Sequence, residues 1–206
     1  MNNNLGFNFT FNSVKTNNNN KTNKNNKNNN NKNNKNNNNN NNNRNNNKNN
    51  KKTATNMKWG TVTWILFHWL AANINEEFYQ RSSEQLHKII KNILYNLPCP
   101  TCKQHAIQFL KDYDIKKAKT KSQFIQYFYF FHNKVNNRKN MIIPNRSILD
   151  TYTKMNGVNI INEWNNNFKN ILGINLNDFM NKRNIEFVKR NMITFLKSNK
   201  QHFSNL

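Results

Sequence analysis

The chain has 206 residues, and its 32 Lys and Arg against 9 Asp and Glu give a formal net charge of +23. No apolar run reaches the roughly 20 residues that a membrane-spanning helix needs. The start MNNNLGFNFTF lacks the basic and apolar parts of a secretory signal. We therefore expect neither a secretory signal nor contact with a membrane.

Residues 1–56 are mostly Asn interrupted by Lys, and they contain no acidic residue. Such a segment cannot bury enough apolar surface to offset the entropy of ordering it, so we predict a disordered tail. Asn, Lys, Ile and Phe have codons rich in A and T, so an AT-rich genome explains both the tail and the basic composition. A nucleic-acid-binding arm is the alternative, although its basic residues would more often cluster and alternate with aromatic ones.

The first predicted helix covers about residues 58–75, where large apolar side chains such as Trp59 and Leu66 recur at helical spacing. A second helix is predicted to begin near Ser82. Ser82 and Gln85 have the spacing of a capping box, and apolar residues follow at helical spacing.

The third predicted helix starts at Cys99, because Pro100 suits the first helical position, where no backbone donor is required. The fourth starts near Thr120, where Gln123 again gives the spacing of a capping box. No strand-like alternation lies between these helices. We therefore predict that residues 57–150 form an all-α four-helix bundle.

A break in the helical pattern comes at 140-NMIIPNRS-147. Two weaker helical stretches follow, at about residues 160–172 and 176–203. We predict that residues 151–206 form a helical C-terminal extension with contacts of its own, whose role the sequence does not indicate.

The two cysteines of the chain, Cys99 and Cys102, are separated by two residues. A zinc site would need His105 and another His as further ligands. A thioredoxin-like dithiol would need βαβ surroundings, and two inert thiols would rarely fall at this spacing by chance. A redox dithiol on a helical scaffold is the fourth interpretation, because a helix start favours a thiolate on Cys99 and one helical turn brings the sulfurs together. Such a dithiol needs a cofactor to pass two electrons efficiently to oxygen.

Two of the predicted helices each present a polar stripe beside an apolar face. The stripe on the first helix consists of Gly60, Trp64 and His68, and the stripe on the fourth consists of His132, Asn136 and Lys139, with Asn133 and Val135 beside it. Trp and His rings can stack on a flat ring system, Asn offers paired donors and acceptors, and Lys can meet a phosphate. Either stripe alone is more typical of a packed core, but together with a CxxC between them they indicate a cofactor pocket.

With these motifs in this order, the sequence resembles the flavin-linked sulfhydryl oxidases of the ERV/ALR type. The motifs are Trp59-Gly60 followed by Trp64 and His68, then Cys99-x-x-Cys102, then His132-Asn133-x-Val135-Asn136. The resemblance covers about residues 57–150, which is under half of the chain.

The resemblance implies a four-helix bundle that holds FAD with its isoalloxazine ring near the CxxC, where Cys102 would lie against the flavin and Cys99 would exchange with substrate. The residues that would line the FAD site are Trp59, Gly60, Trp64, His68, His132, Asn133, Val135, Asn136 and Lys139. The implied reaction converts two thiols and O2 into a disulfide and H2O2. The implied partners are a thiol-containing protein substrate or a redox relay protein, O2 as electron acceptor, and a second copy of the chain in a homodimer, with no metal.

The sequence departs from the family pattern at two places in its fourth helix and beyond. The Leu-Gly-Lys that usually follows the His-Asn motif is replaced by 139-KNM-141, so that the phosphate-contacting residue would be Lys139 or Arg138, or would be missing. Gln123 and Arg146 stand about where many members have the cysteines of a structural disulfide.

Many cellular members also carry a shuttle cysteine pair in a flexible tail, and this chain has none. Cys99 would therefore receive electrons directly from a separate thiol. Compact members without a shuttle are typical of large DNA viruses, so we expect a viral protein that acts in the host cytoplasm and the virion, with the mitochondrial intermembrane space as second choice. The alternative function is a basic nucleic-acid-binding module with a non-catalytic dithiol, although nucleic acid is not the expected partner.

Overall fold

The computed structural model describes residues 43–169 and 176–206, with side chains placed for 58–169 and 180–206. Within these residues the chain is helical and contains no β-strand, apart from an isolated bridge between Ile74 and Phe203. This confirms the predicted all-α class. Among the same residues, no helix is both long enough and apolar enough to cross a membrane.

The first helix, α1, spans Asn43–Asn73 and begins earlier than the predicted start near Lys58. The predicted disordered tail over residues 1–56 overlaps this start, so its last residues are helical, whereas residues 1–42 lie outside the described residues. Helix propagation adds one hydrogen bond for each residue that it fixes. A helix that is anchored by a packed segment therefore extends beyond that segment at little cost.

The second helix, α2, spans Glu76–Tyr95, and the predicted start near Ser82 was wrong. The N-cap is Asn75, whose side-chain oxygen accepts a hydrogen bond from the backbone N–H of Phe78 at 3.0 Å. Ser82 lies inside the helix, where its hydroxyl donates to the carbonyl of Phe78 at 2.6 Å. A serine that bonds back to the preceding turn satisfies its own hydroxyl without capping the helix.

The next two helices begin where the sequence predicts. Helix α3 spans Pro100–Asp112 with Cys99 as N-cap, and helix α4 spans Lys121–Arg138. At the start of α4, Thr120 and Gln123 form a complete capping box. A short 3-10 helix, η1 (Ile115–Lys117), lies between α3 and α4.

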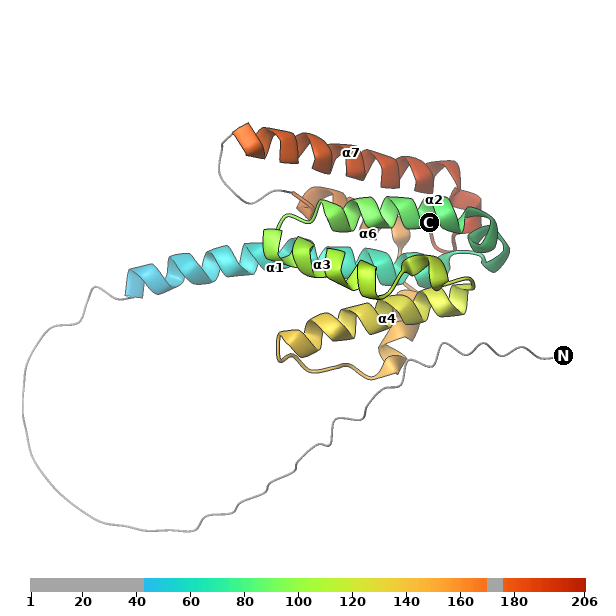
Figure 1. Cartoon of the computed structure of the whole chain (residues 1–206), viewed down its shortest axis with the longest axis horizontal. Helices are drawn as coiled ribbons and strands as arrows, with labels where there is room; N and C mark the ends of the chain where they lie inside the picture. The colour runs from blue at the N-terminus through green and yellow to red at the C-terminus, as the bar shows by residue number, and fades with distance from the viewer. Residues whose placement is uncertain (1–42, 170–175) are drawn as a thin grey trace, which may run out of the picture. The chain divides into compact units, whose positions relative to one another are not determined.

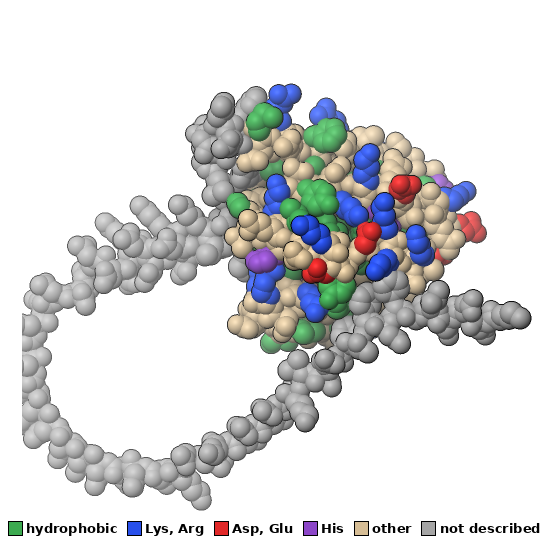
Figure 2. Space-filling model, in the orientation of Figure 1, with side chains coloured by type: hydrophobic (Ala, Val, Ile, Leu, Met, Phe, Trp, Pro, Cys, Tyr) green, Lys and Arg blue, Asp and Glu red, His purple; other side chains and the backbone are tan. Residues whose placement is uncertain are grey.

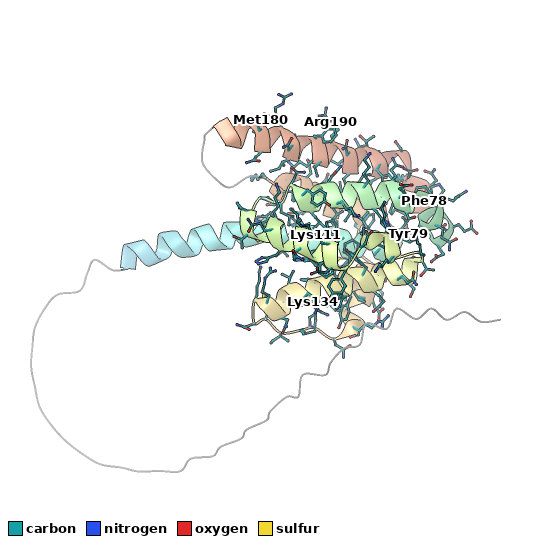
Figure 3. The ribbon with its side chains drawn as sticks, in the orientation of Figure 1. Phe78, Tyr79, Lys111, Lys134, Met180 and Arg190 are labelled. Atoms are coloured by element: carbon teal, nitrogen blue, oxygen red, sulfur yellow. A yellow bond between two sulfur atoms is a disulfide. The ribbon has the colours of Figure 1, made fainter. Side chains whose placement is uncertain are left out.

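These four helices pack around an aromatic core. Helix α1 packs against α4, and α2 packs against both α3 and α4 (Figure 1). Between α1 and α4, the fully buried rings of Phe67 and Phe128 stack with centroids 4.9 Å apart. Tyr79, labelled near the start of α2 in Figure 3, stacks on Phe124 of α4 at 4.7 Å. Burial of such large rings is the main source of stability in a bundle of this size.

The C-terminal residues are helical, as predicted, but they pack on the bundle instead of making separate contacts. The remaining elements are η2 (Arg146–Ile148), α5 (Leu149–Tyr152), α6 (Gly157–Asn167), α7 (Leu176–Ser198) and η3 (Lys200–His202). Helices α5 and α6 pack against α1, and α7 packs against α2 (Figure 1). Fully buried Trp164 and Met192 bring α6 and α7 into the same hydrophobic core as α1–α4.

A glycine makes the contact between α6 and α1 possible. A Cβ atom at Gly157 would overlap the ring of Trp69, which is fully buried on α1. The N–H of Gly157 donates to the carbonyl of Asn205 at 2.6 Å, which fastens the end of the chain to the start of α6.

Candidate functional site

The two cysteines form a disulfide at the start of α3, with their Cα atoms 5.2 Å apart. Cys99 is the N-cap, and its Sγ accepts a hydrogen bond from the backbone N–H of Cys102 at 3.2 Å. Both side chains are half-buried at the edge of the hydrophobic core. In the reduced pair, this donor and the positive end of the α3 dipole favour a thiolate on Cys99.

A continuous series of aromatic contacts runs from α3 to α1. Ala106 and Phe109 are buried and lie four and seven residues after Cys102, so the three share one face of α3. Phe109 stacks on Phe131 of α4, with centroids 3.9 Å apart and planes at 7°. Phe131 in turn meets the edge of Trp64 of α1 at 5.0 Å. The helix that carries the disulfide thus contacts α4 through Phe109 and Phe131, and α4 packs against α1.

The structure brings the two predicted polar stripes together. Trp64 of α1 stacks on His132 of α4, with centroids 4.3 Å apart and planes at 7°. The Nε2 atom of His68 lies 3.1 Å from the Nδ1 atom of His132, within hydrogen-bonding distance. Residues 64 positions apart in the sequence therefore form a single aromatic cluster.

Both imidazoles of this cluster are neutral at physiological pH. Burial, and secondarily the nearby His132, lowers the pKa of His68 from 6.5 to about 3. Burial, and secondarily the positive charge of Lys139, lowers the pKa of His132 to about 4. Each neutral ring carries one N–H, so one ring can donate and the other can accept in the bond between them. The Nδ1 atom of His68 is buried without a hydrogen-bond partner among the described residues.

The other predicted residues of α4 differ in their surroundings. Asn133 is buried, and both its amide nitrogen and its amide oxygen are without a partner among the described residues. Asn136 is also buried, and its carbonyl accepts from the N–H groups of Lys139 at 3.0 Å and Met141 at 2.9 Å. Val135 is half-buried, whereas Lys139 is the C-cap of α4 and is exposed.

The start of the α1 stripe combines a packed tryptophan with an open position. Trp59 is buried, and its carbonyl accepts a hydrogen bond from the hydroxyl of Thr63 at 2.7 Å. Gly60 is half-buried, and a Cβ atom there would meet no atom of the described residues within 4 Å. The glycine therefore leaves free space on the face that Trp64 and His68 continue.

Sequence reasoning missed Tyr152 of α5, which covers the far side of the histidine pair. Its ring stacks on His68, with centroids 4.7 Å apart and planes at 19°. Its carbonyl accepts a hydrogen bond from the amide of Asn73 at 2.9 Å, which ties α5 to α1. No local pattern marks Tyr152, because only the folded chain brings it to His68.

A cleft of about 530 Å³ opens beside His68. Among the residues that line it, Lys121 and Arg146 supply positive charge and Asp150 supplies negative charge. Burial lowers the pKa of Lys121, although the nearby Glu76 partly opposes this shift. The cleft gives a charged or polar group access to the buried imidazole.

These features suit a flat, polar organic cofactor. Asn133 and the Nδ1 atom of His68 are buried polar groups that need partners, and leaving such groups unpaired costs about 1–3 kcal/mol each. Trp64 and His132 add flat faces, and Gly60 adds free space. By contrast, no cluster of three or more His, Cys, Asp or Glu side chains is placed to hold a metal ion in the described part of the chain.

Comparison with known proteins finds a family model that matches the same segment. Residues 61–152 match the family model of the Erv1/Alr family. The chain is 30% identical to the putative FAD-linked sulfhydryl oxidase 096R of Invertebrate iridescent virus 3 over 83 residues, which are 40% of this chain and 56% of that protein. It is 28% identical to the putative FAD-linked sulfhydryl oxidase 347L of Invertebrate iridescent virus 6 over 86 residues, which are 39% of this chain and 78% of that protein. No solved structure matches the chain.

The chain thus spans little more than half the length of the first of these relatives. The matched segment includes both cysteines, the histidine pair and Asn133, and it ends at Tyr152. Trp59 and Gly60 lie immediately before it. Residues 61–152 of this chain are therefore similar to the Erv1/Alr family.

Proposed function

We propose that this chain is an FAD-dependent thiol oxidase that forms disulfide bonds in substrate proteins. The observation that carries the proposal is the Cys99–Cys102 disulfide at the start of α3, on a helix whose Phe109 packs through Phe131 onto Trp64. The match of residues 61–152 to the Erv1/Alr family model supports it, as do the two relatives, which are named as putative FAD-linked sulfhydryl oxidases.

The residues that would hold FAD are those of the two polar stripes. They are Trp59, Gly60, Trp64 and His68 from α1, and His132, Asn133, Val135, Asn136 and Lys139 from α4 and its C-cap. The unpaired amide of Asn133 and the Nδ1 atom of His68 would find partners on the polar groups of the cofactor. When bound, FAD would accept two electrons from the reduced Cys99–Cys102 pair and pass them, with two protons, to O2 to give H2O2.

The cysteine pair itself performs the exchange with substrate. A substrate thiolate attacks the Sγ atom of Cys99, which breaks the Cys99–Cys102 bond, forms a mixed disulfide and releases Cys102 as a thiolate. A second substrate thiolate then attacks the substrate sulfur of the mixed disulfide, which forms the product disulfide and releases Cys99. The substrate loses two electrons and two protons, and the pair gains the two electrons.

The two cysteines have different parts in this scheme because they occupy different positions on α3. Cys99 precedes the helix, where the dipole and the N–H of Cys102 stabilise it as a leaving thiolate. Cys102 lies on the face that carries buried Ala106 and Phe109, which is the face directed at the bundle. We therefore assign the exchange with substrate to Cys99 and the exchange with the cofactor to Cys102.

The substrate is proposed to be a thiol-containing protein or a redox relay protein, with O2 as electron acceptor. Both relatives are viral proteins, which supports a viral protein that acts in the host cytoplasm and the virion. A homodimer belongs to the same proposal.

The test is oxygen uptake by the purified chain in the presence of a dithiol. One O2 should be taken up and one H2O2 formed for every two thiols consumed, and the Cys99→Ser variant should lose this activity. A chain that carries FAD but consumes no oxygen with dithiols or with reduced proteins would contradict the proposal.

A further inference from the structure

Three consecutive apolar side chains are exposed between α4 and η2. Met141, Ile142 and Ile143 are 55%, 91% and 50% exposed. Single exposed apolar residues are common on protein surfaces, but a contiguous group of them marks a site of interaction. We call these three residues the apolar tip.

The backbone presents the apolar tip as a fixed protrusion. On its N-terminal side, Asn140 adopts the left-handed conformation with φ of 53°, and the N–H of Met141 donates to the carbonyl of Asn136 at 2.9 Å. On its C-terminal side, the hydroxyl of the buried Tyr129 donates to the carbonyl of Pro144 at 2.9 Å. Ile142 thus extends from a loop that is fastened to α4 at both of its ends.

Positive charge flanks the apolar tip on both sides. Arg138 and Lys139 precede it, Arg146 follows it, and all three side chains are exposed. The sequence from residue 115 to residue 149 contains no acidic residue. The nearest acid that follows is Asp150, which shares the cleft beside His68 with Arg146. Figure 2 shows hydrophobic side chains at the lower edge of the described residues, where Figure 1 places the segment that follows α4.

We propose that the apolar tip inserts into the surface of an anionic membrane, with Arg138 and Arg146 against the lipid phosphates. Shallow burial of apolar side chains and attraction of cations to anionic lipid are the two contributions that together give stable binding at a membrane interface. Three exposed apolar side chains are enough for shallow insertion. A stable protein interface, by contrast, buries about 800 Å² and roughly 20–30 residues on each partner. The sequence-based expectation of no membrane contact considered only spanning segments, and interfacial binding requires none.

The test is co-sedimentation of the full chain, loaded with FAD, with vesicles of phosphatidylcholine containing about one third phosphatidylserine. Wild type should bind these vesicles and bind much more weakly to phosphatidylcholine alone. Ile142→Asn should weaken binding about tenfold, because the most exposed apolar side chain no longer enters the interface. Val158→Asn, which changes another exposed apolar residue, on α6, should bind like wild type.

A second pair of variants tests the charge contribution, because a chain of net charge +23 binds anionic vesicles to some extent wherever its cations lie. Arg146→Gln should weaken binding more than Lys88→Gln, which removes one exposed cation on α2. Equal binding by wild type and Ile142→Asn would overturn the proposal. So would self-association without lipid that Ile142→Asn abolishes, since the apolar tip would then be a contact between copies of the chain.

Discussion

The Nε2 atom of His68 lies 3.1 Å from the Nδ1 atom of His132, so a hydrogen bond between the buried His68 and the half-buried His132 joins α1 to α4. Trp64 stacks on one ring of the pair and Tyr152 stacks on the other. The pair is held in place by these rings, which leaves the unpaired Nδ1 atom of His68 at a fixed position. In the proposed site, a bound cofactor would meet this acceptor or donor without any rearrangement of the protein.

The histidines should make the flavin-free chain less stable as the pH falls. The folded-state pKa values of His68, His132 and His87 are lowered to about 3, 4 and 4. Below pH 6.5 the unfolded chain therefore binds more protons than the folded chain. The contribution of these histidines to the free energy of unfolding is fully present above that pH and is lost as the pH falls toward 4. Each histidine should contribute a loss of about 1–2 kcal/mol between pH 7 and pH 5, measured by urea unfolding.

His87 provides the control for this pH dependence, because it lies outside the proposed cofactor site. Its Nε2 atom lies 2.9 Å from the hydroxyl of Tyr79, which itself donates to the carbonyl of Ala118 at 2.6 Å. His87→Gln should reduce the loss of unfolding free energy between pH 7 and pH 5 by the contribution of one histidine, and it should leave FAD binding intact. An unfolding free energy that stays constant between pH 7 and pH 5 would contradict the lowered pKa values of the three histidines.

Asn133→Leu should separate stability from cofactor binding. Both polar atoms of the Asn133 amide are buried without a partner among the described residues, so a leucine of similar volume removes an unsatisfied group. The flavin-free variant should unfold with a free energy equal to wild type or higher by about 1–2 kcal/mol. Its FAD content after purification should nevertheless fall. Asn137→Leu, at an exposed position of the same helix, should keep its FAD.

Two glycine substitutions should act in opposite directions on stability. Gly157→Ala forces a Cβ atom into the ring of Trp69 and should cost about 1–3 kcal/mol in the flavin-free chain. The Cβ atom of Gly60→Ala meets no atom of the described residues within 4 Å, so this substitution should stabilise α1 by about 0.5–1 kcal/mol. The free space at Gly60 belongs to the proposed FAD site, so Gly60→Ala should also lower FAD content. Thermal unfolding and flavin absorbance measure the two effects separately.

Cys99→Ser and Cys102→Ser should both abolish oxidation of dithiols while leaving FAD bound. Each variant lacks one sulfur of the pair that exchanges with substrate, so no disulfide is available for attack. Thr101→Ser, which changes an exposed residue between the two cysteines, should retain activity. Full oxidase activity of Cys99→Ser would contradict the direct exchange proposed for this chain.

Local signals in the sequence were enough to place α3 and α4. Pro100 and the Thr120–Gln123 box act through neighbouring backbone groups, so their effect does not depend on the rest of the fold. The predicted start of α2 was wrong because Ser82 and Gln85 also have the spacing of a capping box. Only the structure shows that Asn75 accepts the capping hydrogen bond and that Ser82 lies inside the helix.

Contacts between distant segments could not be predicted in the same way. Helical spacing placed His68 and His132 on the inner faces of their helices, but it could not show that their rings meet. Tyr152 and the packing of Trp164 into the shared core depend on how the chain after α4 returns to α1. The open position at Gly60 likewise emerges only from the packing of its neighbours.

The visible absorption spectrum of the purified chain tests the central claim most directly. The account predicts the absorption band of an oxidised flavin, which disappears when a dithiol is added without oxygen and returns when air is admitted. The band of Cys99→Ser should persist under the same treatment. A colourless chain that cannot take up added FAD, or a flavin band that a dithiol leaves unchanged, would contradict the account.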